Sequence, residues 1–151
     1  YVSTITEKSV QDTSKVRTVL ECMAIDSAVF PLSEAKLQEL ERIDREQHEL
    51  IVTHPEDNLR FAELDKEFHC AIAECCDNAS LIEFIQSINN VMVRFNVLSG
   101  TLPQNRQDAL IEHENIIAFL KKGQREFAKV ALSEHLKHVE ERMLSESKKE
   151  R

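Results

Sequence analysis

Apolar residues recur along this chain at spacings of three and four, in six blocks separated by short polar turns. Val, Ile and aromatic residues do not alternate with polar ones, as they would in half-buried strands. Only two Gly and three Pro interrupt the pattern, which favours long helices over frequent turns. The predicted helices cover residues 15–29, 34–52, 57–76, 80–98, 105–122 and 124–146. The pattern therefore predicts an all-α bundle.

Local signals place the ends of several of these helices. Asp12, Thr13 or Ser14 is expected to cap the first helix, and residues 1–11, which show no clear period, are expected to be a linker. Ser33 is expected to cap the second helix, and Gly123 to take a left-handed conformation after the fifth. The stripe expected to be buried in the first helix consists of Val16, Val19, Leu20, Met23 and Ser27.

Composition narrows the class of protein. With 151 residues, 42% hydrophobic and 30% charged, the chain can bury one core, so residues 12–151 are expected to form a single domain. A formal net charge of -8 argues against DNA or RNA binding by this segment, because phosphate binding needs a clustered basic surface. The four Cys form no CxxC pair, and no apolar run could span a membrane. We therefore expect a cytoplasmic protein.

Four ionisable residues fall on or beside faces that should be buried. Asp65 and His69 lie one turn apart beside the apolar stripe of the third helix. His113 lies within the stripe of the fifth helix and His135 within that of the sixth. A lone inward His is more often a hydrogen-bonded core residue than a ligand, but a buried carboxylate with three imidazoles needs a common explanation.

A divalent cation supplies that explanation. Neutral imidazole nitrogens and a carboxylate oxygen suit zinc, and also nickel, manganese or iron. Side chains from facing helices can converge inside a bundle. We therefore predict an interior metal site formed by Asp65, His69, His113 and His135.

Signatures of metal enzymes are mostly missing. The stretch HENII at 113–117 begins like the HExxH motif, but Ile117 stands where the second His must be. A metal-dependent hydrolase or isomerase remains an alternative, and it would need a base, for which only His138 is near enough to the inward face. A second alternative is a structural bundle whose histidines are ordinary core residues.

Four stretches together resemble one family, the effector-binding (FCD) domain of FadR-type GntR transcription regulators. The stretches are VRTVLE (16–21), LDKEFHCAIAECCDN (64–78), IEHENIIAFLKKG (111–123) and AKVALSEHLKHV (128–139). The resemblance implies an antiparallel bundle of six to seven helices around an interior cavity. It also implies a regulatory domain rather than an enzyme, joined to a winged-helix DNA-binding domain that lies outside this chain.

The resemblance assigns roles to particular residues. In metal-containing members the ligands are one Asp and three His, which fall here on the same four positions. The implied effector is a small organic acid, whose carboxylate would bind the metal and a nearby Arg. Our candidates for effector binding are Arg17, Asn89 and Asn96, although Arg17 could instead pair with Glu21 at the surface. The family also implies a homodimer.

Overall fold

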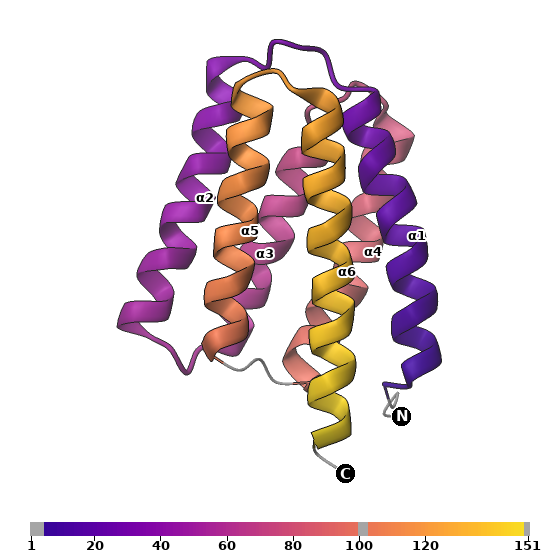
Figure 1. Ribbon diagram of the computed structural model, residues 1–151, viewed down its shortest axis with the longest axis vertical. Helices are drawn as coiled ribbons and strands as arrows, with labels where there is room; N and C mark the ends of the chain where they lie inside the picture. The colour runs from indigo at the N-terminus through magenta and orange to yellow at the C-terminus, as the bar shows by residue number, and fades with distance from the viewer. Residues whose placement is uncertain (1–4, 100–102, 150–151) are drawn as a thin grey trace.

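Six helices make up the fold in the computed structural model, which describes residues 5–99 and 103–149 (Figure 1). Consecutive helices run in opposite directions, so the chain passes up and down the bundle. The helices are α1 (Glu7–Asp26), α2 (Glu34–Thr53), α3 (Asn58–Ala73), α4 (Ala79–Ser99), α5 (Pro103–Lys121) and α6 (Arg125–Lys149). The predicted all-α antiparallel bundle is confirmed.

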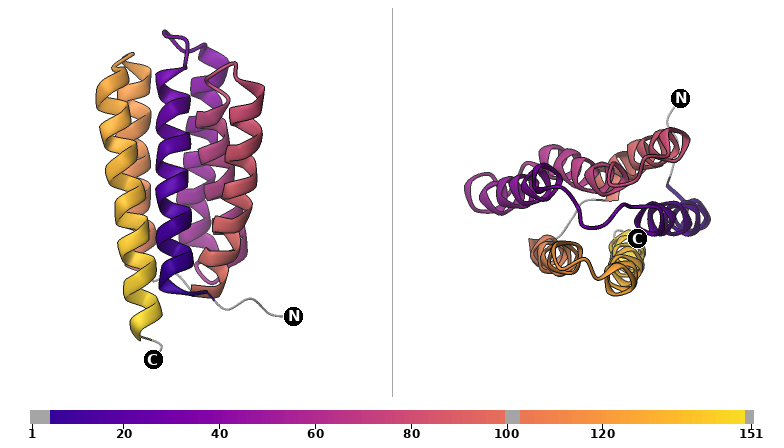
Figure 2. Two further views of the ribbon diagram at one scale, coloured as in Figure 1. Left: turned by 90° about the vertical axis from the view of Figure 1, so that its right-hand side faces the viewer. Right: turned by 90° about the horizontal axis from the view of Figure 1, so that it is seen from above.

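The helices form two layers when the bundle is seen from above (Figure 2). One layer contains α2, α3 and α4, and the other contains α5 and α6, with α1 beside α6 and α4. Contacts between α2 and α5, between α1 and α3, and between α4 and α6 join the layers. The interior between the layers is where side chains from α3, α5 and α6 can meet.

Capping side chains begin several of the helices, and the cap predicted at Ser33 is confirmed. Ser33 accepts a hydrogen bond from the backbone N–H of Lys36 at the start of α2, and Asp57 does the same for Arg60 at the start of α3. Asn78 accepts one from the N–H of Leu81 in α4. Gly123 has φ 70° after α5, the left-handed conformation predicted for it.

The first helix begins earlier than predicted. Thr6 and Ser9 form a reciprocal capping box, and α1 starts at Glu7 rather than after residues 12–14. Residues 7–11 are therefore helical and not a linker, whereas residues 1–4 lie outside the described part of the chain. The third helix ends earlier than predicted, because α3 stops at Ala73 and not at residue 76.

The buried face of α1 is also not the predicted one. Val16, Val19 and Met23 are 52%, 61% and 45% exposed. The residues that α1 buries are Val10, Ser14, Arg17, Glu21, Ala24 and Ile25. The prediction failed because it followed the apolar side chains alone, whereas Arg17 and Glu21 pair with each other inside the bundle.

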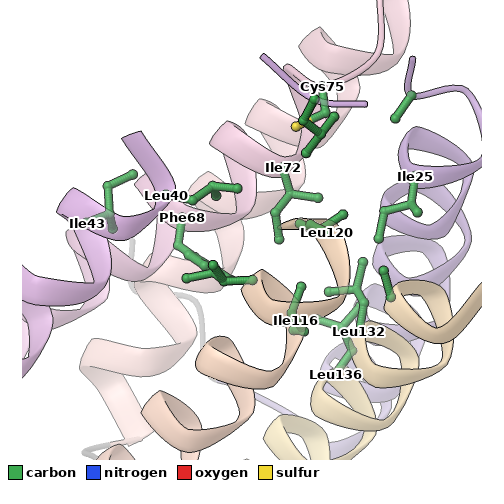
Figure 3. Packing of buried hydrophobic residues seen from close by; sticks show 14 of the residues in the cluster. Ile25, Leu40, Ile43, Phe68, Ile72, Cys75, Ile116, Leu120, Leu132 and Leu136 are labelled. Atoms are coloured by element: carbon green, nitrogen blue, oxygen red, sulfur yellow. The ribbon is translucent and has the colours of Figure 1, made fainter. Parts of the chain in front are cut away.

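The main apolar core lies between α2, α3, α5 and α6, with Ile25 reaching in from α1 (Figure 3). Phe68 of α3 belongs to this core and is fully buried. Its ring also stacks on the imidazole of His113, with the ring centroids 3.9 Å apart. The core therefore continues directly into the polar cluster of the interior.

Candidate metal centre

The bundle brings together the four side chains that the sequence singled out. Asp65 and His69 come from α3, His113 from α5 and His135 from α6, and all four are buried. One potential ligand atom of each lies within 4.8 Å of the others. The Nε2 atom of His113 is 3.3 Å from Asp65 Oδ1 and 3.2 Å from His135 Nε2.

The outer nitrogen of each imidazole is held by an oxygen acceptor. The Nδ1 atom of His69 lies 2.5 Å from Glu21 Oε1, and that of His113 lies 3.1 Å from Gln47 Oε1. The Nδ1 atom of His135 lies 2.6 Å from Glu112 Oε1. Because carboxylate and amide oxygens accept, each Nδ1 donates its N–H outward. This places the lone pair of every Nε2 inside the cluster.

The Nε2 atoms of the three histidines are hydrogen-bond acceptors that face other acceptors. The Nε2 atoms of His113 and His135 approach within hydrogen-bonding distance, yet neither carries a proton in the tautomer that the Nδ1 contacts select. The Nε2 atom of His69 is buried without a hydrogen-bond partner in the described part of the chain. Together with the Asp65 carboxylate, these lone pairs fit a cation, and the donor set is three nitrogens and a carboxylate oxygen.

The protonation of the imidazoles agrees with this role. Burial lowers the pKa of His135 to about 3, which its hydrogen bond to Glu112 only partly offsets. Burial also lowers the pKa of His113, against the opposing effect of Asp65. Both imidazoles are therefore neutral near pH 7, which is the form that binds metals.

Glu21, Gln47 and Glu112 are functional residues that the sequence reasoning missed. Burial by itself raises the pKa of Glu21, but its interactions with His69 and Arg17, including a hydrogen bond from each, outweigh burial and lower the pKa to about 2. Glu112 has a pKa of about 2 because bonds from His135 and Arg142 outweigh its burial. Both carboxylates are thus charged acceptors. Such partners orient metal-binding imidazoles and raise their basicity.

Two of the predicted effector residues, Arg17 and Asn89, bond to Glu21 instead. Arg17 is 1% exposed, and its Nε lies 2.8 Å from Glu21 Oε2, so the pair with Glu21 exists but is buried. The Nδ2 atom of Asn89 lies 3.3 Å from the same oxygen and donates to the Ile85 carbonyl.

A small cavity opens beside Asp65, with a volume of about 40 Å³. Asn96, the third predicted effector residue, lines it. Its other polar or charged lining residues are Asn58, Asp65, Ser99, Asn105, Arg106 and Arg142. The cavity and the cluster are therefore joined through Asp65, whereas Arg17 and Asn89 do not line this cavity.

Comparison with known proteins decides the family, because the family model described as the FCD domain matches residues 12–138. This chain belongs to the FCD domain family. It is 27% identical over 145 residues to the HTH-type transcriptional regulator YdhC of Bacillus subtilis (strain 168). It is 24% identical over 141 residues to the HTH-type transcriptional repressor RspR of Escherichia coli (strain K12). These matches cover 91% and 93% of this chain, but only 64% of YdhC and 61% of RspR.

Solved structures show the same FCD fold. A GntR family transcriptional regulator from Pseudomonas syringae pv. tomato str. DC3000 superposes with a TM-score of 0.72 at 19% identity, over 99% of this chain and 63% of that one. The metal-free FCD domain of TM0439 gives a TM-score of 0.74 at 20% identity, over 97% and 99% of the two chains. The predicted resemblance to the FCD domain is confirmed.

Two further findings bear on the alternatives. His138, the base that an enzyme would need, has a side chain that is 47% exposed and is bonded to Glu112. The relatives themselves are named as transcriptional regulators and not as enzymes. None of the helices, over the residues described, is both long and apolar enough to cross a membrane.

Proposed function

We propose that this FCD domain is the ligand-sensing part of a bacterial transcription regulator, and that it binds a divalent metal and a small carboxylate effector. The observation that carries the proposal is the convergence of Asp65 with the Nε2 atoms of three buried histidines, each fixed through its Nδ1. The donor set suits zinc first, and also nickel, manganese or iron.

A metal bound by these four residues would supply positions for an effector carboxylate. The cavity beside Asp65 is the space in which the rest of the effector would lie, with Asn96 as a hydrogen-bonding residue. Arg17 would not touch the effector but would hold Asp65 in position, because Arg17 Nη2 lies 4.0 Å from Asp65 Oδ2. Asn89 would also act indirectly, because it bonds to Glu21, the acceptor of His69.

DNA binding belongs to the proposal only through another part of the protein. The chain spans less than two thirds of the curated relatives it matches, and both are named HTH-type regulators. We therefore propose a winged-helix domain before this one, a cytoplasmic location and a homodimer. Effector binding would change the affinity for DNA if the effector prefers one arrangement of the two subunits.

Elemental analysis with a chelator tests the metal. We expect about one divalent ion per chain after purification without immobilised nickel. Removing it with a chelator should lower the melting temperature, because a ligand that binds only the folded state stabilises it by about 4 kcal/mol at a thousandfold excess over Kd.

Re-addition of zinc should restore the melting temperature of the chelated chain. A protein that carries no ion, and whose melting curve neither a chelator nor added zinc shifts, would contradict the proposed metal centre. The FCD fold would be unaffected by that result.

A further inference from the structure

Arg142 links the interior cavity to the surface of the bundle. It lines the cavity beside Asp65 and also a groove on the outside of α5 and α6, together with Glu112 and His138. Its side chain is 19% exposed. The Arg142 guanidinium therefore stands in the wall between the cavity and solvent.

Glu112 holds Arg142 in this wall and at the same time holds a predicted metal ligand. The guanidinium donates to Glu112 Oε1 at 2.7 Å and to Glu112 Oε2 at 3.0 Å. The same Oε1 accepts from His135 Nδ1 at 2.6 Å, and Oε2 accepts from His138 Nδ1 at 2.9 Å. A carboxylate has about four acceptor positions, so Arg142 and His135 share an acceptor that is fully used.

Arg142 retains donors for a second anion. A guanidinium has five N–H groups, and its bonds to Glu112 use two of them. By contrast, the cavity's other guanidinium, Arg106, bonds to the Pro55 carbonyl and lies 5.4 Å from the centre of the Phe61 ring. The partner of Arg142 is itself a carboxylate, so another carboxylate can take up donors of the same guanidinium.

The size of the cavity fits a movement of this side chain. A volume of about 40 Å³ holds only about three water molecules, at roughly 10–15 Å³ each by this measure. A larger organic acid would fit only if the Arg142 side chain moved and enlarged the cavity.

We propose that Arg142 receives the carboxylate of the effector, and that its shared acceptor Glu112 couples effector binding to the metal ligand His135. This inference rests on the proposed function. When an effector carboxylate takes up part of the Arg142 charge, Glu112 becomes a stronger acceptor for the His135 N–H. That increases the basicity of His135 Nε2 and strengthens its binding to a metal. Reciprocity requires that the metal then tightens effector binding by the same factor.

Arg142→Gln tests the inference, with malonate, succinate and citrate as probe carboxylates and zinc as the metal. Zinc uptake is measured first, by elemental analysis, and the affinity for each carboxylate then by calorimetry with and without zinc. We expect R142Q to take up one zinc per chain and to bind the carboxylates about tenfold more weakly or worse, because a charge-assisted hydrogen bond is lost. Arg142→Lys, which keeps the charge but not the fork, should fall between the two.

Two matched variants separate the roles. Arg94→Gln removes a charge from an exposed position of α4 and should bind zinc and carboxylates as the wild type does. Glu112→Gln keeps the Arg142 residue but removes the charged acceptor that it shares with His135. This variant should weaken zinc binding by about 10- to 100-fold, as loss of such a partner does at other sites.

The outcomes are distinguishable. Normal zinc uptake with carboxylate affinities that match the wild type in both R142Q and R142K would overturn the role of Arg142 alone. No binding of any of the three probes to the zinc-loaded wild type would overturn the carboxylate site. Absence of zinc uptake by the wild type would overturn the proposed function, and the coupling with it.

Discussion

Replacing Glu21 by alanine is expected to destabilise the domain by about 3–5 kcal/mol, because it leaves a buried charge without its partner. Glu21 is 0% exposed and accepts from both Arg17 and His69. Arg17 is itself fully buried, so its guanidinium would remain in the interior without that carboxylate. Chemical denaturation of the metal-free chain measures the change in the free energy of unfolding.

Two further variants test this explanation for Glu21. Glu63→Ala removes a carboxylate whose side chain is 48% exposed and pairs with Arg60 at 3.6 Å, and it should change the free energy of unfolding by about 0–1 kcal/mol. The double variant Arg17→Met, Glu21→Ala removes both charges and should be more stable than E21A. If E21A unfolded at the same denaturant concentration as E63A, the buried pair of Arg17 and Glu21 would not contribute to stability as expected.

Replacing His113 and His135 together by alanine is expected to abolish zinc binding. The two residues supply two of the four predicted ligands, and their Nε2 atoms lie 3.2 Å apart. Zinc should then give none of the stabilisation expected for the wild type, which is about 4 kcal/mol at a thousandfold excess over Kd. Elemental analysis and melting curves with and without zinc make the measurement.

His54→Ala is the matched control for the histidine variant. His54 is exposed and follows α2, away from the four predicted ligands, so H54A should retain one zinc per chain. A double variant that still took up one zinc with wild-type affinity would exclude the site and would leave the histidines as ordinary core residues.

The helical period was enough to predict the fold and the four clustered side chains. Asp65 and His69 lie beside an apolar stripe, and His113 and His135 lie within one. Their helical spacing shows this without any knowledge of packing, and a core rarely contains these residue types. The FCD match and the solved structures confirm the fold. That these residues bind a metal remains a prediction.

The pattern could not predict how charged residues pair inside the bundle. On α1 it assigned Val16 and Val19 to the interior, whereas the helix buries Arg17 and Glu21. Glu21 follows Arg17 by four residues and lies on the same helix face as Val10 and Ala24. Its burial could therefore have been predicted from this spacing. The partners that make this face favourable, His69 and Asn89, come from α3 and α4, and no local period reports them.

The other two supporting residues differ in how visible they were. Gln47 lies between Ile43 and Leu50 at helical spacing, so its place on the buried face of α2 was readable. Glu112 had no such signal, because it is only partly buried and its importance comes from His135 and Arg142 on α6. A contact between helices is decided by their packing, which periodicity along one helix does not contain.

The hydrogen bonds around the cluster reach every helix of the bundle. Predicted ligands come from α3, α5 and α6, their acceptors Glu21, Gln47 and Glu112 from α1, α2 and α5, and Asn89 of α4 bonds to Glu21. No helix can separate from the others without breaking this connected set, so the bundle should open as one cooperative unit. A change at the cluster therefore reaches α1 through a single bond, between His69 and Glu21, and needs no long chain of intermediates.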